Sequence, residues 1–302
     1  MSAADQRPAR ADTIDAARVA AWLRRFAHLV EREEPLLTAL DRAIGDGDHG
    51  KNLNRGMQAV VAALRDIAPP ADMAPDGVSV GPAKPAARAS SPGAGGKAPK
   101  VADGGGPGSG ETSDAVPAAE KSASASEKIP AAAMPAAKKA HGETGTAPAA
   151  VSLADVLRRA AMALIGAAGG SCGPLYGAFF LRLAQACGEA AALTPDQLVD
   201  ALHAGLVTLL GSGKAGIGDK TMVDAIAPAV SALRDGLASG KPLGEALGAA
   251  ATAAREGCEA TISMKANSGL AALLGDKSIG HADPGAASMA LLFAAADGTL
   301  AA

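Results

Sequence analysis

The feature that most constrains the fold is an apolar period of three to four residues, which recurs through most of the chain. Leu53, Met57, Val60, Val61 and Leu64 show it clearly, because positions i, i+4, i+7, i+8 and i+11 share one face of an α-helix. No segment shows the alternation with β-branched residues that is typical of strands. We therefore predict an all-α fold, an eight-helix antiparallel up-and-down barrel or bundle with a long disordered insertion.

Glycine-rich loops interrupt these helices at alternate junctions. The loops lie near residues 45–52, 169–174, 211–221 and 276–285. Because alternate junctions of an antiparallel bundle lie at the same end, the loops are expected to form one common rim. The sequence thus predicts a single composite site, built from segments that are far apart along the chain.

Residues 68–150 differ from the rest of the chain in composition. Ala, Pro, Gly, Ser and Lys dominate there, without an aromatic residue or a periodic apolar face. Such a segment cannot bury enough apolar surface to offset the entropy of ordering it, so we predict a disordered insertion. A disordered tail is predicted at 1–11. Residues 12–67 alone would make too small a core, so they and 151–302 are predicted to form one domain.

Composition also limits the possible partners and surroundings. A net charge of −3 and an aromatic content of 2% argue against nucleic-acid binding. Cys172, Cys187 and Cys258 lack the spacing of disulfide or zinc patterns, which favours a reducing cytoplasm. No apolar run reaches about 18 residues, so no membrane segment is expected.

The first loop carries three carboxylates, Asp41, Asp46 and Asp48, interleaved with glycines. Glycine allows the backbone to approach a ligand closely, and carboxylates bind hard cations such as Mg²⁺. The loop also opens a helix, whose N-terminus favours anions such as phosphate. These features predict a metal–nucleotide site. The alternative is a helix start with incidental acidic residues.

The other loops allow two interpretations each. Residues 170–173 (Gly-Ser-Cys-Gly) open a helix and would offer amides to phosphate, or they allow close helix packing. Asp283 and Pro284 fit an N-cap followed by proline at N1, as well as a place in the site. Lys214 and Lys220 would either meet phosphate charge or lie in solvent. No Walker A sequence occurs, so a P-loop enzyme is excluded.

Together the four loops resemble the nucleotide-binding subunit L of dihydroxyacetone kinase. The matching motifs are D-x4-D-x-D-H-G at 41–50, GGSCGPLYGAFF at 169–180, GKAGIGDKTMVD at 213–224 and SIGHADPG at 278–285. The resemblance covers everything except the tail and the insertion. It implies an eight-helix barrel with ADP or ATP at one rim, and two Mg²⁺ ions on Asp41, Asp46 and Asp48. It also implies nucleotide contacts from His49, Gly50, Lys51, Asn52, Ser171, Cys172, Gly213, Thr221, Met222, Asp283, Pro284 and Gly285.

The resemblance also implies an activity, phosphoryl transfer to dihydroxyacetone that a separate subunit K holds. The donor is ATP or, in the phosphotransferase-system branch, bound ADP that a phosphocarrier subunit M rephosphorylates. Nothing in the sequence looks like a second, substrate-binding domain. Two alternatives stay open: a related kinase subunit for another polyol, ketose or acyl substrate, and a non-catalytic nucleotide-binding regulator.

Three features depart from the family pattern. Cys172 stands where a second serine is usual, and residues 68–150 replace a short connection. Leu270 stands where the pattern Gly-Arg-Ala has arginine, so no guanidinium meets the phosphates from this position. Lys265 or Lys277 is the alternative source of that charge. The identity of the phosphoryl donor therefore stays open.

Overall fold

The computed structural model describes residues 13–70, 151–213 and 215–301. The predicted tail lies outside these residues, as does the predicted insertion except for 68–70. Lys214, a candidate phosphate ligand, also lies outside them.

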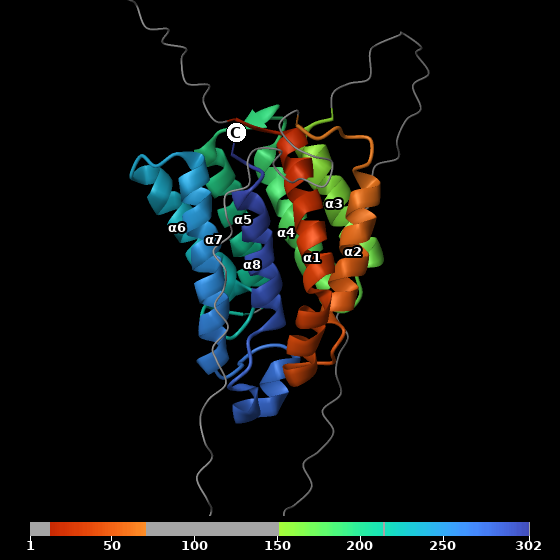
Figure 1. Cartoon of the computed structure of the whole chain (residues 1–302), viewed down its shortest axis with the longest axis vertical. Coiled ribbons are helices and arrows are strands. Elements are labelled where there is room, and N and C mark those ends of the chain that lie inside the picture. The colour runs from red at the N-terminus through yellow and green to blue at the C-terminus, as the bar shows by residue number, and fades with distance from the viewer. Residues whose placement is uncertain (1–12, 71–150, 214, 302) are drawn as a thin grey trace, which may run out of the picture. The chain divides into compact units, whose positions relative to one another are not determined.

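Within the described residues the chain is almost entirely helical, which confirms the all-α prediction (Figure 1). The α-helices are α1 (Ala16–Ile44), α2 (His49–Ala63), α3 (Leu153–Ala167), α4 (Cys172–Cys187), α5 (Pro195–Gly213), α6 (Val223–Ala238), α7 (Leu243–Ala260) and α8 (Pro284–Asp297). Two 3₁₀ helices, η1 (Thr261–Ser263) and η2 (Leu270–Ser278), lie between α7 and α8. Strands β1 (Ile14–Asp15) and β2 (Ala192–Leu193) form a short antiparallel pair.

The α-helices close into a ring. Each helix packs against the next one along the chain, and α8 packs against α1. The loop between α1 and α2 and the segment between α7 and α8 both lie at the lower end in Figure 1, whereas the strand pair lies at the upper end. None of the described helices is long and apolar enough to cross a bilayer.

Helix α1 is continuous across a proline. It runs from Ala16 to Ile44 without a break and contains Pro35. Proline removes a backbone donor inside a helix. Burial of Val30 and Leu37 on both sides of the proline keeps the two halves in one helix.

Aromatic side chains tie α1 to α4 in the core. Trp22 and Phe180 meet edge to face with their ring centroids 6.2 Å apart, and Phe26 lies 6.0 Å from Tyr176. The Trp22 indole donates a hydrogen bond of 2.9 Å to the carbonyl oxygen of Leu292, which adds α8 to the cluster. Buried aromatic pairs contribute about 0.5–1.5 kcal/mol each beyond their area. This cluster fixes the helices whose ends carry the loops.

Capping residues set where the helices begin. Ser152 accepts from the amide of Asp155 at the start of α3, and Asp283 accepts from the amide of Ala286 at the start of α8. A capping box opens α5, since Thr194 and Gln197 exchange side-chain and backbone bonds. Local sequence thus determines where these loops end and the helices start.

Candidate functional site

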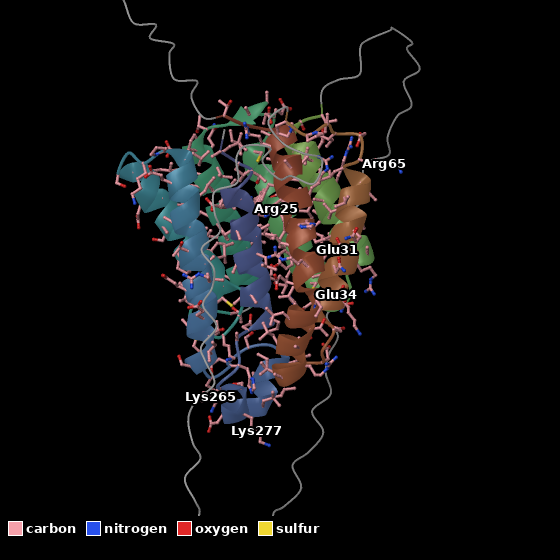
Figure 2. The ribbon with its side chains drawn as sticks, in the orientation of Figure 1. Arg25, Glu31, Glu34, Arg65, Lys265 and Lys277 are labelled. Atoms are coloured by element: carbon pink, nitrogen blue, oxygen red, sulfur yellow. The ribbon has the colours of Figure 1, made fainter. Side chains whose placement is uncertain are left out.

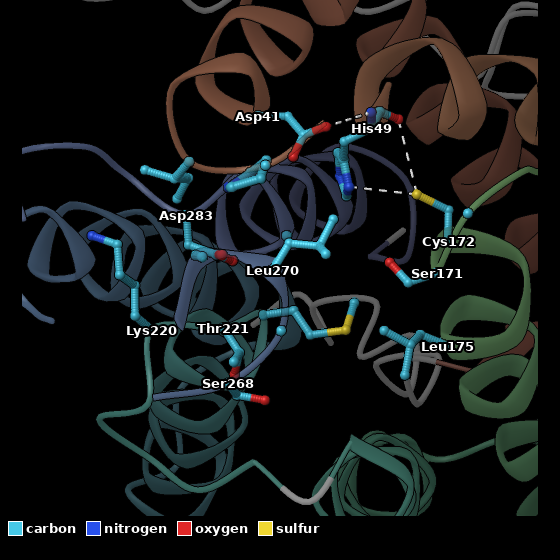
Figure 3. A pocket seen from close by; sticks show the side chains of 18 of the residues that line it. Asp41, His49, Ser171, Cys172, Leu175, Lys220, Thr221, Ser268, Leu270 and Asp283 are labelled. Carbon is cyan, nitrogen blue, oxygen red and sulfur yellow. Dashed lines mark hydrogen bonds between the residues drawn. The ribbon is translucent and has the colours of Figure 1, made fainter. Parts of the chain in front are cut away.

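A cavity of about 630 Å³ opens where the four glycine-rich loops meet (Figure 3). Each of the four loops contributes lining residues, so the predicted composite rim exists. The polar and charged lining comprises Asp41, Asp46, Asp48, His49, Ser171, Cys172, Tyr176, Lys220, Thr221, Ser268 and Asp283.

Three carboxylates gather on one side of this cavity. Asp41, Asp46 and Asp48 each offer an oxygen atom, and these atoms all lie within 4.8 Å of one another. Burial raises the pKa of Asp48, a hydrogen bond from Asn52 opposes this, and the charges of Asp46 and Asp41 raise it further. An all-oxygen donor set of mutually repelling carboxylates suits a hard divalent cation such as Mg²⁺. The residues present therefore fit the metal that the sequence predicts.

Asp41 also makes hydrogen bonds within the protein. Its Oδ2 accepts hydrogen bonds from the amides of Asp48 (2.8 Å) and His49 (3.0 Å), and so it caps α2. The sequence predicts that the N-terminus of α2 attracts phosphate, which stays a prediction for the amides of Gly50 and Lys51. Because an aspartate of α1 already satisfies the amides of Asp48 and His49, these two are not available to a ligand.

The N-terminus of α4 is the second predicted phosphate site. Its N-cap residue, Ser171, makes no side-chain capping bond, and both Ser171 and Cys172 line the cavity. Gly170 before them has a φ of 57°, a conformation that glycine adopts without strain. Gly173 serves packing instead, because a Cβ there would lie 2.9 Å from the carbonyl oxygen of Ala168. The packing interpretation thus holds at Gly173, and the phosphate interpretation of this loop stays a prediction.

A chain of hydrogen bonds runs behind the carboxylates and joins three of the loops. The Cys172 thiol lies 3.4 Å from His49 Nδ1, and His49 Nε2 lies 2.9 Å from Ser288 Oγ. Ser288 also accepts from the Tyr176 hydroxyl at 2.8 Å and donates to the carbonyl oxygen of Gly285. With its own proton used, Ser288 accepts from His49, so Nδ1 is left to accept from the thiol.

The imidazole and the thiol in this series of hydrogen bonds are neutral. Burial lowers the pKa of His49, and burial together with the charge of Asp48 raises the pKa of Cys172 to about 12. A thiol with such a pKa is no nucleophile at neutral pH. Cys172 therefore orients His49, and the family's serine would donate the same bond.

The opposite wall comes from the third and fourth loops, where Thr221 and Met222 face Asp283 and Gly285. A Cβ at Gly285 would lie 3.4 Å from the Cβ of Met222, so these two loops are in contact. Burial raises the pKa of Asp283 to about 7, the Ala286 amide opposes this, and Asp224 adds to the increase. A partly protonated carboxyl at this wall can both donate and accept hydrogen bonds.

Most predicted contact residues line the cavity, but four do not. Lys51 is exposed, and Asn52 is buried behind Asp48, where it also accepts from Arg55. Gly50 packs against α1. Gly213 is the last residue of α5. The nucleotide contacts of all twelve residues remain predictions.

The structure decides between the candidate cations near the cavity. Leu270 reaches the mouth with 55% of its surface exposed (Figure 3). Lys265 pairs with Asp276 at 2.9 Å, and neither it nor Lys277 lines the cavity (Figure 2). Lys220 lines it but is 1% exposed, so it is neither a solvated lysine nor a free phosphate ligand. The described lining residues thus include four carboxylates and one lysine, whose ammonium is buried.

The sequence did not predict the apolar wall of the cavity or the place of Ser268 in its lining. The wall consists of Ile44, Leu175, Leu209, Ala215, Val223, Leu270 and Ala271. Their signal was the ordinary helical period, which does not distinguish a side chain that faces a pocket from one that faces the core.

The eight α-helices close into a barrel, with carboxylates and helix-opening glycines at one rim. This fold is that of the DAK2 domain family. The DAK2 domain matches residues 131–297, and the chain belongs to that family. The ADP-binding subunit DhaL of the PEP-dependent dihydroxyacetone kinase of Escherichia coli is 30% identical over 268 residues, which is 89% of each chain.

Two further relatives are larger than this chain. L-erythrulose 1-kinase of Mycolicibacterium smegmatis is 39% identical over 163 residues, 51% of this chain and 28% of that enzyme. The crystal structure of the dihydroxyacetone kinase of C. freundii with AMP-PNP and Mg²⁺ matches with a TM-score of 0.50 at 22% identity. That match covers 98% of this chain and 36% of the other, and it supports the fold.

Proposed function

We propose that this chain is the nucleotide-binding, phosphoryl-transferring subunit of a dihydroxyacetone kinase. The observation that carries the proposal is the cluster of Asp41, Asp46 and Asp48 beside the N-terminus of α4 in one cavity. Phosphoryl transfer needs a metal to neutralise phosphate charge and backbone amides to orient the phosphates. The cavity offers carboxylates for the metal and the N-terminus of α4 for the phosphates, within a space that suits one small ligand.

Each side of the cavity would then hold one part of the nucleotide. The carboxylates would hold Mg²⁺, and three of them suit two ions better than one. The metal, when bound, supplies the positive charge that lowers the barrier to transfer. The amides that begin at Ser171 would orient phosphate oxygens, and the apolar wall with Leu175 and Leu209 would receive the base.

The acceptor would be dihydroxyacetone on a separate subunit K. The relative from Escherichia coli is named as an ADP-binding subunit of a kinase, and this chain spans most of its length. By name, that kinase depends on PEP, which favours bound ADP that a phosphocarrier subunit M recharges. L-erythrulose 1-kinase shares the domain, so a related ketose is the alternative acceptor.

One observation favours a second candidate, a nucleotide-binding regulator without catalysis. Leu270 presents an apolar side chain at the mouth, where the family pattern has a guanidinium. Without that charge, the bound metals alone would have to stabilise the transferring phosphate. Such a pocket can retain a Mg²⁺–nucleotide complex and yet transfer slowly.

Calorimetric titration of ADP with Mg²⁺ tests binding, with Asp46→Asn and Asp48→Asn as variants. Both substitutions should abolish Mg²⁺-dependent binding while the helical circular dichroism stays unchanged, because the two side chains lie outside the core. Asp155→Asn, at the start of α3 and outside the cavity, is the matched control and should bind like the parent. If both site variants bind ADP and Mg²⁺ normally, the metal assignment is wrong.

Transfer is tested separately, by adding a dihydroxyacetone-loaded subunit K. Formation of dihydroxyacetone phosphate with either ATP or a phosphorylated subunit M identifies the donor. Mass spectrometry of the protein as purified adds a direct check, since retained ADP supports the phosphocarrier route. Tight nucleotide binding without product from either donor would favour the regulator.

A further inference from the structure

Lys220 is a buried charge that the proposed chemistry does not use. Lys220 is 1% exposed. Its backbone φ of 61° is positive, although it is not a glycine. Burying an ammonium is costly unless hydrogen bonds replace its water. A backbone strained in this way persists only where the surroundings fix it.

Three carbonyl oxygens replace that water. The ammonium donates to Thr261 (2.6 Å), Met264 (3.2 Å) and His281 (2.5 Å), so each of its three protons has an acceptor. Figure 3 shows the nitrogen of Lys220 pointing away from Leu270 and the centre of the pocket. With no proton left to donate, Lys220 does not bind phosphate directly.

The acceptors bracket one segment, residues 261–283, which we call the strap. The chain leaves α7 at Thr261 and enters α8 after Asp283, so the ammonium joins the start of the strap to its end. Ser268, Gly269, Leu270 and Ala271 of the strap line the cavity. One side chain of the third loop thus closes the segment that forms a wall of the site.

Few other apolar contacts hold the strap. Ala266 and Ala271 form a small buried cluster with Ile44, apart from the main core. Leu273 at the far end is 84% exposed. Segments with so little buried apolar surface open more easily than the core. The three hydrogen bonds from Lys220 therefore contribute strongly to holding the strap in position.

The third loop is shaped to present Lys220 at this point. Asp224 accepts from the amides of Gly218 and Thr221, on both sides of the lysine. Asp219 accepts from the amide of Gly216 at 2.6 Å and from the Asn267 side chain of the strap at 3.2 Å. These bonds hold the strained conformation in place.

We propose that Lys220 is a positioning residue, which closes the strap and so holds the pocket wall at Ser268–Ala271 against bound nucleotide. The inference rests on the proposed function for its ligand, an Mg²⁺–ADP complex. The side chain itself touches neither phosphate nor metal.

Lys220→Met removes the three donors and keeps the apolar length of the side chain. We expect Mg²⁺–ADP to bind about tenfold more weakly or worse, since three charge-assisted bonds that order the wall are lost. Hydrogen exchange should become faster in the strap, while α3 and α4 keep their protection. Lys241→Met, an exposed lysine between α6 and α7, is the control and should match the parent in both measurements.

The outcomes separate this role from others. Parental affinity in Lys220→Met, or a loss of protection throughout the bundle, would overturn the proposal. If that variant does not fold, Lys220→Ala is titrated with propylammonium, which should restore ADP affinity where propanol does not; no effect of the amine also overturns it. If the parent itself fails to bind Mg²⁺–ADP, the proposed function fails, and strap exchange still decides the role of Lys220.

Discussion

Gly50 allows the sharpest test of how the site is held together. It is the second residue of α2 and lies against α1. A Cβ built there would lie 2.5 Å from both the Glu34 carbonyl oxygen and Thr38 Oγ1, and 2.8 Å from the Thr38 amide nitrogen. Real Cβ atoms do not approach backbone this closely, so Gly50→Ala must push α2 away from α1.

The effect of Gly50→Ala on the free energy of unfolding is the sum of two opposing contributions. Overpacking of a well-packed contact costs about 1–3 kcal/mol. Alanine gains back up to about 1 kcal/mol over glycine inside a helix. We therefore expect Gly50→Ala to lower the free energy of unfolding by about 1–2 kcal/mol, or roughly 2–8 °C in Tm for a domain of this size.

Gly166 supplies the matched control. It lies on the last turn of α3, and a Cβ there would meet nothing within 4 Å. Gly166→Ala should raise the free energy of unfolding by up to about 1 kcal/mol, because only the helix propensity changes. Urea denaturation of both variants beside the parent measures the difference directly.

The same variant also tests how α1 and α2 build the metal loop. The bonds from Asp48 and His49 to Asp41 depend on the helix spacing, so a displaced α2 should weaken Mg²⁺–ADP binding severalfold. Unchanged stability in Gly50→Ala would refute the packing argument. Lost binding at unchanged stability would instead support a direct nucleotide contact at Gly50.

Four further predictions follow from the site. Leu270→Arg should tighten ADP binding about tenfold in a titration, because a guanidinium adds charge-assisted bonds. Parental affinity would mean that the loop at Leu270 is arranged differently from the family pattern. Burial raises the pKa of Asp283 to about 7, so its folded form binds a proton more tightly than the unfolded chain does. Stability should therefore fall as pH rises from about 4 to 7, and Asp283→Asn should flatten that profile in denaturation series. Cys172→Ser should keep ADP affinity, because serine also donates to His49; a large loss would show that the thiol packs specifically. Deleting residues 72–146 should change the free energy of unfolding by about 1–2 kcal/mol at most, since loop entropy grows slowly with length; a variant that unfolds would show that the insertion stabilises the domain.

The sequence by itself determined most of the helices, some of their caps, and the carboxylates and glycines of the rim. Apolar periodicity and capping residues are local, so Ser152, Thr194 and Asp283 could be recognised without knowing the fold. The position of the carboxylates on a glycine loop followed in the same way. The alternation of glycine-rich loops was enough to place them at one end, because up-and-down helices must return there.

Only the tertiary structure decided how each side chain is used. Asp41 accepts from the amides of Asp48 and His49 across a loop, and no local pattern predicts which amides a distant carboxylate will occupy. Lys220 could be a phosphate ligand or a solvated lysine until three carbonyl groups from a distant segment surround it. Burial and hydrogen-bond partners depend on residues far apart in sequence, and these pairings exist only once the helices have packed into a ring.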